Sequence, residues 1–285
     1  MFGAHVSLKD SVGNTAQTAQ EAGMTAMQVF LGSPYHLARR TVTDVEAKYL
    51  KSQADKISVF THLPYVHNFA GRANMKALAH SGNTEVDKYV DSCVASVQDE
   101  LDKMSKCSCK GCVLHIGSIG SLKDRRAGCQ SVAKSINKLN LTSTPLLLET
   151  MVGRGGVLGC NFHELAQVYH NVQDKDNVGF CLDTCHIFGE GLYDISKVDE
   201  VDKMFAEFDE ILGANNLRLI HLNDSQEAFG SHKDRHEKIG QGLIWKQDDA
   251  ALVQVLKQAK TRGVPVVLET SEDDFVNLQA TLKKV

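Results

Sequence analysis

The chain has 285 residues, of which 42% are hydrophobic and 23% charged, and its formal net charge is −4. These values are typical of globular proteins and exclude disordered, collagen-like and coiled-coil chains. They also exclude a strongly basic surface that holds nucleic acid by bulk charge alone, so any DNA binding must use local charge.

The sequence has no feature of a membrane or secreted protein. No apolar run approaches the ~20 residues of a membrane-spanning helix. The start, MFGAHVSLKD, lacks the basic and apolar segments of a secretory signal. Eight cysteines are too few for a disulfide scaffold. We therefore expect a soluble intracellular protein, cytoplasmic or nuclear, with reduced thiols and no membrane partner.

Eight short β-rich runs occur along the chain and predict strands. They cover residues 2–5, 26–30, 58–62, 112–116, 145–149, 179–183, 217–221 and 265–269. Each gap between successive runs is long enough for a helix. In the third gap, apolar residues recur every three or four positions, which predicts an amphipathic helix with Asp and Lys outside. These apolar residues are Tyr89, Cys93, Val97, Leu101 and Met104.

The pattern of the runs predicts the fold class. CVLHI, PLLLE and PVVLE are continuously apolar, as in strands of a parallel sheet that is buried on both faces. Eight strand-and-helix units predict an α/β fold, a (β/α)8 TIM barrel. No linker or block of like charges divides the chain, so we expect one domain over residues 1–285. A doubly wound open sheet is the alternative.

Six of the predicted strands end at, or within one residue of, a side chain that can bind a metal. In a TIM barrel the carboxyl ends of all strands meet on one face, so these residues would converge. Unpaired, they would repel one another or lose solvation, and divalent cations are the usual compensation. The six residues are His62, His115, Glu149, Asp183, His221 and Glu269.

Two further clusters extend this set. DTCH adds His186 just after the sixth strand, and GSHKDRH adds Asp234 and His236 after the seventh. Five of the nine candidates are histidines and four are carboxylates, a mixture that favours Zn²⁺ over Mg²⁺ or Ca²⁺. With about three protein ligands for each ion and one bridging carboxylate, nine ligands predict a centre of about three zinc ions.

The motifs occur in a specific order: GAHVS, His62, HIGS, LET, LDTCHIF, HLND, GSHKDRH with KIGQG, and a second LET. Over nearly the whole chain this order resembles the endonuclease IV family of zinc-dependent abasic-site (AP) endonucleases. The resemblance implies a TIM barrel with three zinc ions. It assigns His62, His115 and Glu149 to the first zinc, with Glu149 bridging to the second. The remaining assignments are Asp183, His221 and Glu269 to the second zinc, and His186, Asp234 and His236 to the third.

The resemblance also implies the reaction. It predicts a base excision repair enzyme that hydrolyses the phosphodiester 5′ to abasic sites in duplex DNA, leaving a 3′-hydroxyl and a 5′-deoxyribose phosphate. Blocked 3′ ends would be secondary substrates, the catalytic carboxylates would be Glu149 and Glu269, and the enzyme would be a monomer. Zinc supplies a nucleophile by lowering the pKa of bound water to about 7. Three zinc ions would also bring the formal charge of −4 to about +2.

Two kinds of residue are candidates for contacts with DNA. LPYVHN resembles the family segment that enters the minor groove, which makes Tyr65 and Val66 candidate wedge residues beside a flipped abasic site. Packing of the loop is the alternative. Basic residues after the predicted strand ends could bind phosphates, Arg154 and Arg235 above all. The others are Arg39, Arg40, Arg72, Lys123, Arg125 and Arg126.

Some positions depart from the family pattern. After Pro34 the family usually has Arg and, two residues later, Trp, whereas this chain has Tyr35, His36 and Leu37, so a ring would have to replace those DNA contacts. Ile119 replaces a family histidine, and Arg154 replaces a glutamine. The group Cys107, Cys109 and Cys112 is interpreted as free thiols because no fourth zinc ligand accompanies it.

Two other functions fit parts of the pattern. A TIM-barrel sugar isomerase also gathers His, Asp and Glu around divalent metals at the strand ends, but it would need fewer histidines. A noncatalytic zinc-dependent protein could bind damaged DNA without cutting it. Zinc content would separate the first from the nuclease, and turnover on an abasic duplex would separate the second.

Overall fold

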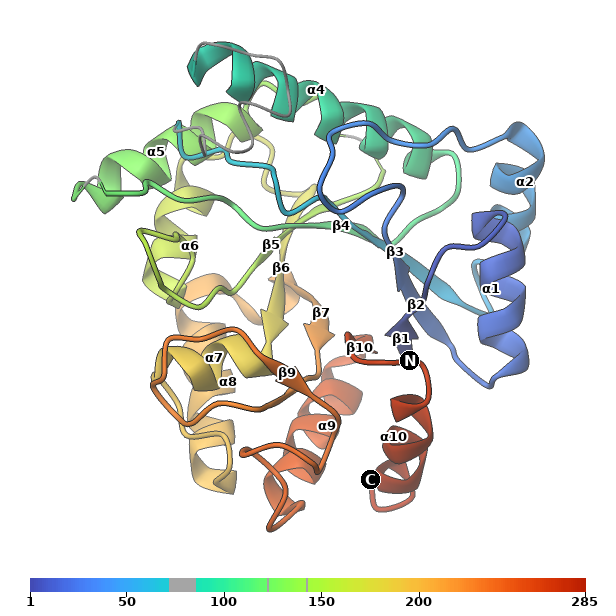
Figure 1. The fold of residues 1–285 in the computed structure, drawn as a ribbon, viewed down its shortest axis with the longest axis vertical. Helices are drawn as coiled ribbons and strands as arrows, with labels where there is room; N and C mark the ends of the chain where they lie inside the picture. Colours follow the sequence, from blue (N-terminus) through green and yellow to red (C-terminus); the bar gives the residue numbers. More distant parts are fainter. Residues whose placement is uncertain (72–85, 122, 142) are drawn as a thin grey trace.

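The computed structural model describes residues 1–71, 86–121, 123–141 and 143–285. Eight parallel strands of this described part close into a barrel in the order β1-β10-β7-β6-β5-β4-β3-β2, and helices surround them in Figure 1. Closure requires that β1 pairs with both β2 and β10, and it does so through Gly3 and Ala4. The predicted TIM barrel is confirmed and the open sheet is excluded. Arg72 lies outside the described residues.

All eight predicted strands are present, three with the predicted bounds and five with an end that shifts by one or two residues. The fourth ends at Leu114 rather than residue 116, and the eighth at Leu268 rather than residue 269. His115 and Glu269 therefore lie just past the last ladder residues. The barrel strands are β1 Phe2–His5, β2 Ala26–Val29, β3 Ser58–His62, β4 Gly111–Leu114, β5 Leu146–Glu149, β6 Val178–Asp183, β7 Leu217–His221 and β10 Val266–Leu268.

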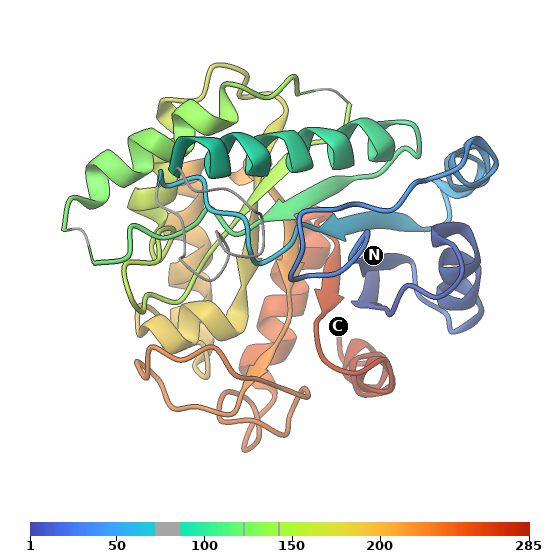
Figure 2. The same ribbon diagram turned by 45° about the horizontal axis from the view of Figure 1, so that its top comes forward.

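The helices form the outer ring, as the view in Figure 2 also shows. A short antiparallel pair, β8 Asp224–Ser225 and β9 His236–Glu237, follows β7. The helices are α1 Val12–Glu21, α2 Asp44–Gln53, α4 Val86–Ser105, α5 Arg125–Ile136, α6 Phe162–His170, α7 Thr184–Glu190, α8 Val198–Leu212, α9 Ala250–Arg262 and α10 Asp274–Leu282, with the short 3-10 helix η1 Ala214–Asn216.

Local sequence signals explain where helices start. Thr43 and Glu46 form a capping box at α2, in which each side chain accepts a hydrogen bond from the backbone N–H of the other residue. The predicted amphipathic helix is α4, and all five predicted apolar positions are buried. Glu100 is buried on the same face and lies 3.7 Å from the Arg39 guanidinium. The spacing that predicts the helix also places Glu100 on this face, three residues after Val97 and four before Met104, but it gives no sign of the Arg39 partner.

The barrel interior is closed by one apolar layer, here called the barrel floor. It takes one side chain from each of seven strands, and β1 contributes Gly3, where an added Cβ would lie 1.6 Å from the Ala26 carbonyl oxygen. Only glycine fits at that position. The seven side chains are Ala26, Phe60, Val113, Leu147, Cys181, Leu219 and Val267.

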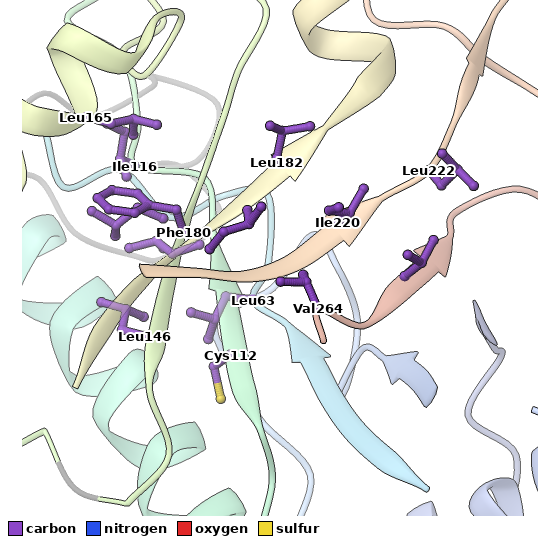
Figure 3. Close-up of a cluster of buried hydrophobic side chains, with 14 of the residues drawn as sticks. Leu63, Cys112, Ile116, Leu146, Leu165, Phe180, Leu182, Ile220, Leu222 and Val264 are labelled. Atoms are coloured by element: carbon purple, nitrogen blue, oxygen red, sulfur yellow. The ribbon is translucent and has the colours of Figure 1, made fainter. Parts of the chain in front are cut away.

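A larger core lies between the strands and the helices. Figure 3 shows part of it, with Leu146, Phe180 and Ile220 from three strands and Leu165 from α6. The Phe180 ring also contacts Phe208 of α8, with ring centroids 6.0 Å apart. This apolar packing holds the strands in register, so that the residues at their carboxyl ends have fixed positions.

The structure agrees with the prediction that the cysteines are free thiols. All eight cysteines are free thiols and all are buried, including Cys107, Cys109 and Cys112. Cys185 is fully buried as well. Within the described ranges, no helix combines the length and apolar character that crossing a membrane requires.

His67 is a buried histidine in the loop after β3. It is 3% exposed, and neither of its ring nitrogens has a hydrogen-bond partner among the described residues. Burial lowers the pKa of His67 to about 3, and the Arg39 charge acts in the same direction. The folded chain therefore keeps this ring neutral.

We expect His67→Leu to make the fold less sensitive to acid. The ordinary pKa is 6.5, so below that pH the unfolded chain takes up a proton that the folded chain, with a pKa of about 3, does not. The wild type should lose about 2 kcal/mol through this residue between pH 7 and pH 5, and the variant should not. Urea unfolding at both pH values measures this, with exposed His163→Leu as the matched control. A difference between His67→Leu and wild type that does not change with pH would contradict the assignment.

Candidate metal centre

A ring of polar side chains lies directly above the barrel floor. Side chains two positions apart in a strand point to the same face, so the residue two positions after each floor residue also points into the barrel. In all eight strands this residue is polar. The ring consists of His5, Gln28, His62, His115, Glu149, Asp183, His221 and Glu269.

His62, His115 and Glu149 form the first group of this ring. Glu149 Oε2 lies 3.3 Å from His62 Nε2 and 2.8 Å from His115 Nε2. His62 Nδ1 lies 2.7 Å from the Leu63 carbonyl oxygen, which only accepts, so Nδ1 carries the hydrogen. The Nε2 lone pair of His62 is thereby directed toward Glu149, as a metal ligand requires.

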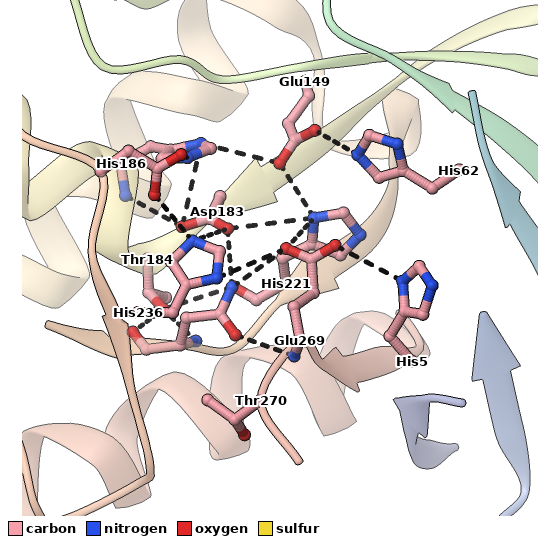
Figure 4. Close-up of polar contacts among 12 residues, drawn as sticks. His5, His62, Glu149, Asp183, Thr184, His186, His221, His236, Glu269 and Thr270 are labelled. Carbon is pink, nitrogen blue, oxygen red and sulfur yellow. Dashed lines mark hydrogen bonds and ion pairs between the residues drawn. The ribbon is translucent and has the colours of Figure 1, made fainter. Parts of the chain in front are cut away.

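The second group surrounds His221. Its Nδ1 lies 2.9 Å from Glu149 Oε1, 3.3 Å from Glu269 Oε2 and 3.9 Å from Asp183 Oδ2. Figure 4 shows Glu149 between His62 and His221. The two oxygens of Glu149 thus face two different groups, which is the geometry that a bridging carboxylate needs.

The DTCH motif joins this group to a third. Asp183 is the N-cap of α7, and its Oδ1 accepts a hydrogen bond from His186 N at 2.9 Å. The capped first turn directs the His186 side chain back over the barrel. His186 Nδ1 lies 2.8 Å from the Thr150 carbonyl oxygen, so its Nε2 is left to face Asp234 Oδ2 at 3.2 Å.

The hairpin β8/β9 brings the last two candidates to the same place. His236 pairs with Ser225 in this hairpin, and His236 Nε2 lies 3.1 Å from Asp234 Oδ1. Asp224 of the HLND motif fixes the hairpin, because its carboxylate accepts backbone N–H groups of the KIGQG segment and the residues after it. These donors are Gly240, Gly242 and Ile244.

The arrangement has the character of a cation site. Among the described residues, the buried atoms His186 Nε2 and His236 Nε2 have no hydrogen-bond partner, although Asp234 oxygens lie 3.2 and 3.1 Å away. Such converging nitrogens and oxygens are satisfied by a metal ion. In the part of the chain that the structure describes, ligand atoms within 4.8 Å of one another form four groups: His62, His115 and Glu149; Glu149, Asp183, His221 and Glu269; Asp183, His186 and His236; and Cys185, Asp234 and His236.

These groups contain all nine predicted ligands. The first two groups match the predicted sets, with Glu149 shared between them. The predicted third set is divided between two overlapping groups, and the structure adds Cys185 to one of them. Cys185 Sγ is therefore an additional candidate ligand atom that the sequence did not single out for this purpose.

The electrostatics agree with this geometry. Burial favours the neutral acid, but the rings of His115 and His221 hold the pKa of Glu149 well below its usual range. Burial likewise opposes charge on His236, yet Asp183, Asp234 and Glu269 raise its pKa to about 9. Without an ion, protons take the place of cations among these carboxylates. A metal would replace those protons.

Three residues of the site were not predicted. Gln28 contacts His221 and Glu269, and Asn223 donates through Nδ2 to Asp183 Oδ2 at 2.7 Å and Glu269 Oε2 at 3.2 Å. His5 Nδ1 lies 3.9 Å from Glu269 Oε1. The alternation from the barrel floor would have identified Gln28 and His5, since both stand two residues after a floor position. Asn223 lies past the end of β7 and has no such signal.

The candidate wedge residues have different environments. Tyr65 is 46% exposed, and its ring lies over the first group, with centroids 5.4 Å from His62 and 5.2 Å from His115. Val66 is half-buried and packs against the core. Tyr35 is exposed beside Tyr65, with ring centroids 6.2 Å apart. Tyr35 therefore places an aromatic ring in the loop after Pro34, where the sequence departs from the family pattern.

The basic residues that were predicted to bind phosphates also differ in their environments. Arg154 and Arg235 are exposed in loops that follow β5 and β8. The expectation was wrong for Arg39, whose side chain is fully buried and pairs with Glu100. Arg40 and Arg125 form ion pairs with carboxylates of the chain itself, Glu46 and Glu164.

Similarity to known proteins identifies the family of this chain. A family model described as a xylose isomerase-like TIM barrel matches residues 16–284. A probable endonuclease 4 of Methanosphaera stadtmanae is 31% identical over 277 residues, which cover 95% of this chain and 93% of that protein. The chain belongs to the endonuclease IV family. Membership confirms the resemblance of the motifs and identifies an enzyme, a DNA-cleaving hydrolase.

Solved structures agree with this assignment. The crystal structure of endonuclease IV from Thermus thermophilus has a TM-score of 0.80 and 25% identity, with 100% of this chain and 99% of that chain covered. A D-tagatose 3-epimerase-like protein has a TM-score of 0.68 at 19% identity, with 99% and 96% covered. The second match shows only that the barrel fold is shared.

Proposed function

We propose that this chain is a zinc-dependent base excision repair endonuclease that hydrolyses the phosphodiester 5′ to an abasic site in duplex DNA. The products would carry a 3′-hydroxyl and a 5′-deoxyribose phosphate, and blocked 3′ ends would be secondary substrates. The proposal rests above all on the convergence of nine ligand-type side chains at one barrel mouth, with Glu149 facing two groups.

Zinc suits this donor set better than Mg²⁺. Five of the nine ligands are imidazoles, and Mg²⁺ prefers oxygen ligands. His62, His115 and Glu149 would hold one ion, Glu149, Asp183, His221 and Glu269 a second, and His186, Asp234 and His236 a third. When bound, zinc ions would supply a water nucleophile of pKa about 7 and would stabilise charge on the phosphate and the leaving oxygen.

The protein itself would supply the orientation of the groups that bind the metal. Backbone carbonyl groups fix the imidazole tautomers of His62 and His186, and Asn223 holds both Asp183 and Glu269. These contacts hold the reacting groups at fixed distances, which lowers the entropic part of the barrier. The fully buried carboxylate of Glu149 is the centre of this arrangement.

Recognition of the lesion would come from the loops around the mouth. Tyr65 overhangs the first group, where it could support DNA from which an abasic sugar is extruded. Exposed Arg154 and Arg235 could bind phosphates on either side. Membership of the endonuclease IV family sets aside the sugar isomerase and the noncatalytic DNA-binding protein, neither of which would cut an abasic duplex.

The test of the reaction is Glu149→Gln. We expect this variant to lose incision of a tetrahydrofuran-containing duplex much more than it loses binding, because the amide cannot replace a bridging carboxylate while phosphate contacts persist. Gel incision and fluorescence anisotropy measure the two properties on the same DNA. Glu46→Gln, which changes a carboxylate at the cap of α2, should retain incision. Wild-type turnover by Glu149→Gln would contradict the proposed reaction.

The wedge assignment predicts a lesion-specific loss. Replacing Tyr65 and Val66 by Ala should weaken binding to an abasic duplex about tenfold, because the side chains that support an unstacked base step are removed. Binding to undamaged duplex at the same salt concentration should barely change. Tyr65→Phe keeps the ring and should bind like wild type. Equal losses on both DNAs would indicate a general contact instead of a wedge.

A further inference from the structure

Gln28 of β2 is the only member of the ring of eight inward-pointing residues that is neither a carboxylate nor an imidazole. Its side chain is completely buried. Gln28 Oε1 lies 2.9 Å from His221 Nε2, and Gln28 Nε2 lies 2.9 Å from Glu269 Oε1 and 3.0 Å from His5 Nδ1. One amide thus contacts side chains from three other strands, through both its oxygen and its nitrogen.

The chemistry of these neighbours fixes which way the amide points. An ionised carboxylate only accepts hydrogen bonds, so the NH₂ group of Gln28 must face Glu269. Gln28 Oε1 must then face His221, and His221 must donate through Nε2–H. The hydrogen of neutral His221 is therefore on Nε2, and the lone pair is on Nδ1, the atom that faces Glu149, Asp183 and Glu269.

Two other histidines of the centre are fixed in a similar way by the backbone. The Leu63 carbonyl accepts from His62 Nδ1, and the Thr150 carbonyl accepts from His186 Nδ1, at 2.7 and 2.8 Å. In His221 the roles of the two ring nitrogens are exchanged, and the acceptor is a side chain. The orientation of the His221 ring therefore depends on the identity of residue 28, whereas that of His62 and His186 does not.

We propose that Gln28 is a positioning residue of the metal centre. It fixes the tautomer and orientation of His221 and restrains Glu269, so that both present ligand atoms to the same ion. Contacts of this kind behind a metal-binding histidine typically change metal affinity by about 10–100-fold. The inference rests on the metal centre of the proposed function and goes beyond it by assigning residue 28 to one site of that centre.

The test is Gln28→Met, which keeps the length of the side chain and removes its polar atoms. Competition between the metal-free protein and a fluorescent chelator for Zn²⁺ measures each binding step. One step should weaken by about 10–100-fold and the others should stay at their wild-type values. Thr61→Val is the matched control, since it removes a buried polar group of β3 whose partner is Cys112 Sγ. A folded Gln28→Met protein with wild-type zinc affinity at every step would overturn the proposal.

A second measurement needs no variant. In zinc-loaded wild-type protein labelled with ¹⁵N-histidine, NMR should show His221 with its hydrogen on Nε2, protected from exchange, and with Nδ1 bound to the metal. His62 and His186 should show the opposite pattern. Coordination of His221 through Nε2 would overturn the proposal, whatever Gln28→Met does to folding.

Failure of this inference differs from failure of the proposed function. The zinc titration uses no DNA, so a chain that binds zinc in a Gln28-dependent way but does not cut an abasic duplex would contradict only the proposed reaction. A chain that cuts the duplex and binds zinc equally well with Met at position 28 would contradict only the role of Gln28. A wild-type chain that binds no zinc would overturn both.

Discussion

Several buried carboxylates at one end of the barrel repel one another, and the site depends on positive charge that offsets this repulsion. Glu149 and Asp183 are fully buried, and Glu269 is 11% exposed in its side chain. Burying an ionised carboxylate without compensation costs several kcal/mol, and several of them together also repel one another. The carboxylates raise the pKa of His186, His221 and His236 although burial opposes charge on these rings, and metal ions would provide the same positive charge while leaving the nitrogens as ligands.

The rest of the fold makes this concentration of charge possible. The apolar barrel floor fills the interior beneath the ring of polar residues. The polar groups therefore face the end of the barrel at which the strands have their carboxyl ends. Above the floor, Asp183 caps α7. The Asp224 carboxylate accepts hydrogen bonds from backbone N–H groups of the segment after β9, and these bonds hold the β8/β9 hairpin in place. Each candidate ligand therefore lies on a strand, directly after a strand end, in the capped first turn of a helix or in the β8/β9 hairpin. Rigid support of this kind is what ligand geometry at a metal requires.

The sequence predicted the barrel fold and identified the nine candidate metal ligands, because both have strong local signals. Continuous apolar runs identified the eight strands, and a barrel then forced His62, His115 and Glu149 together although they are far apart in the chain. Other features depend on side-chain orientation. The buried pair of Arg39 and Glu100 was not predicted: the helical spacing places Glu100 on the apolar face, three residues after Val97, but it does not show that Arg39 lies against it.

Residues that act through others were the hardest to predict. Gln28 and Asn223 have side-chain types that are common at strand ends and loops, and neither is a usual metal ligand. Their roles follow only from distances to His221, Glu269 and Asp183. In contrast, the alternation of side chains along a strand is visible in the sequence. Combined with the floor positions, it places Gln28 and His5 in the ring.

A count of metal ions in the native protein is the direct test of the three-zinc centre. Protein purified without chelators should contain about three zinc ions per chain by elemental analysis, since nine ligands with one bridge suffice for three open sites. Removing them should abolish incision of an abasic duplex, and Zn²⁺ but not Mg²⁺ should restore it. Fewer than about two zinc ions per chain, or full restoration by Mg²⁺, would contradict the account.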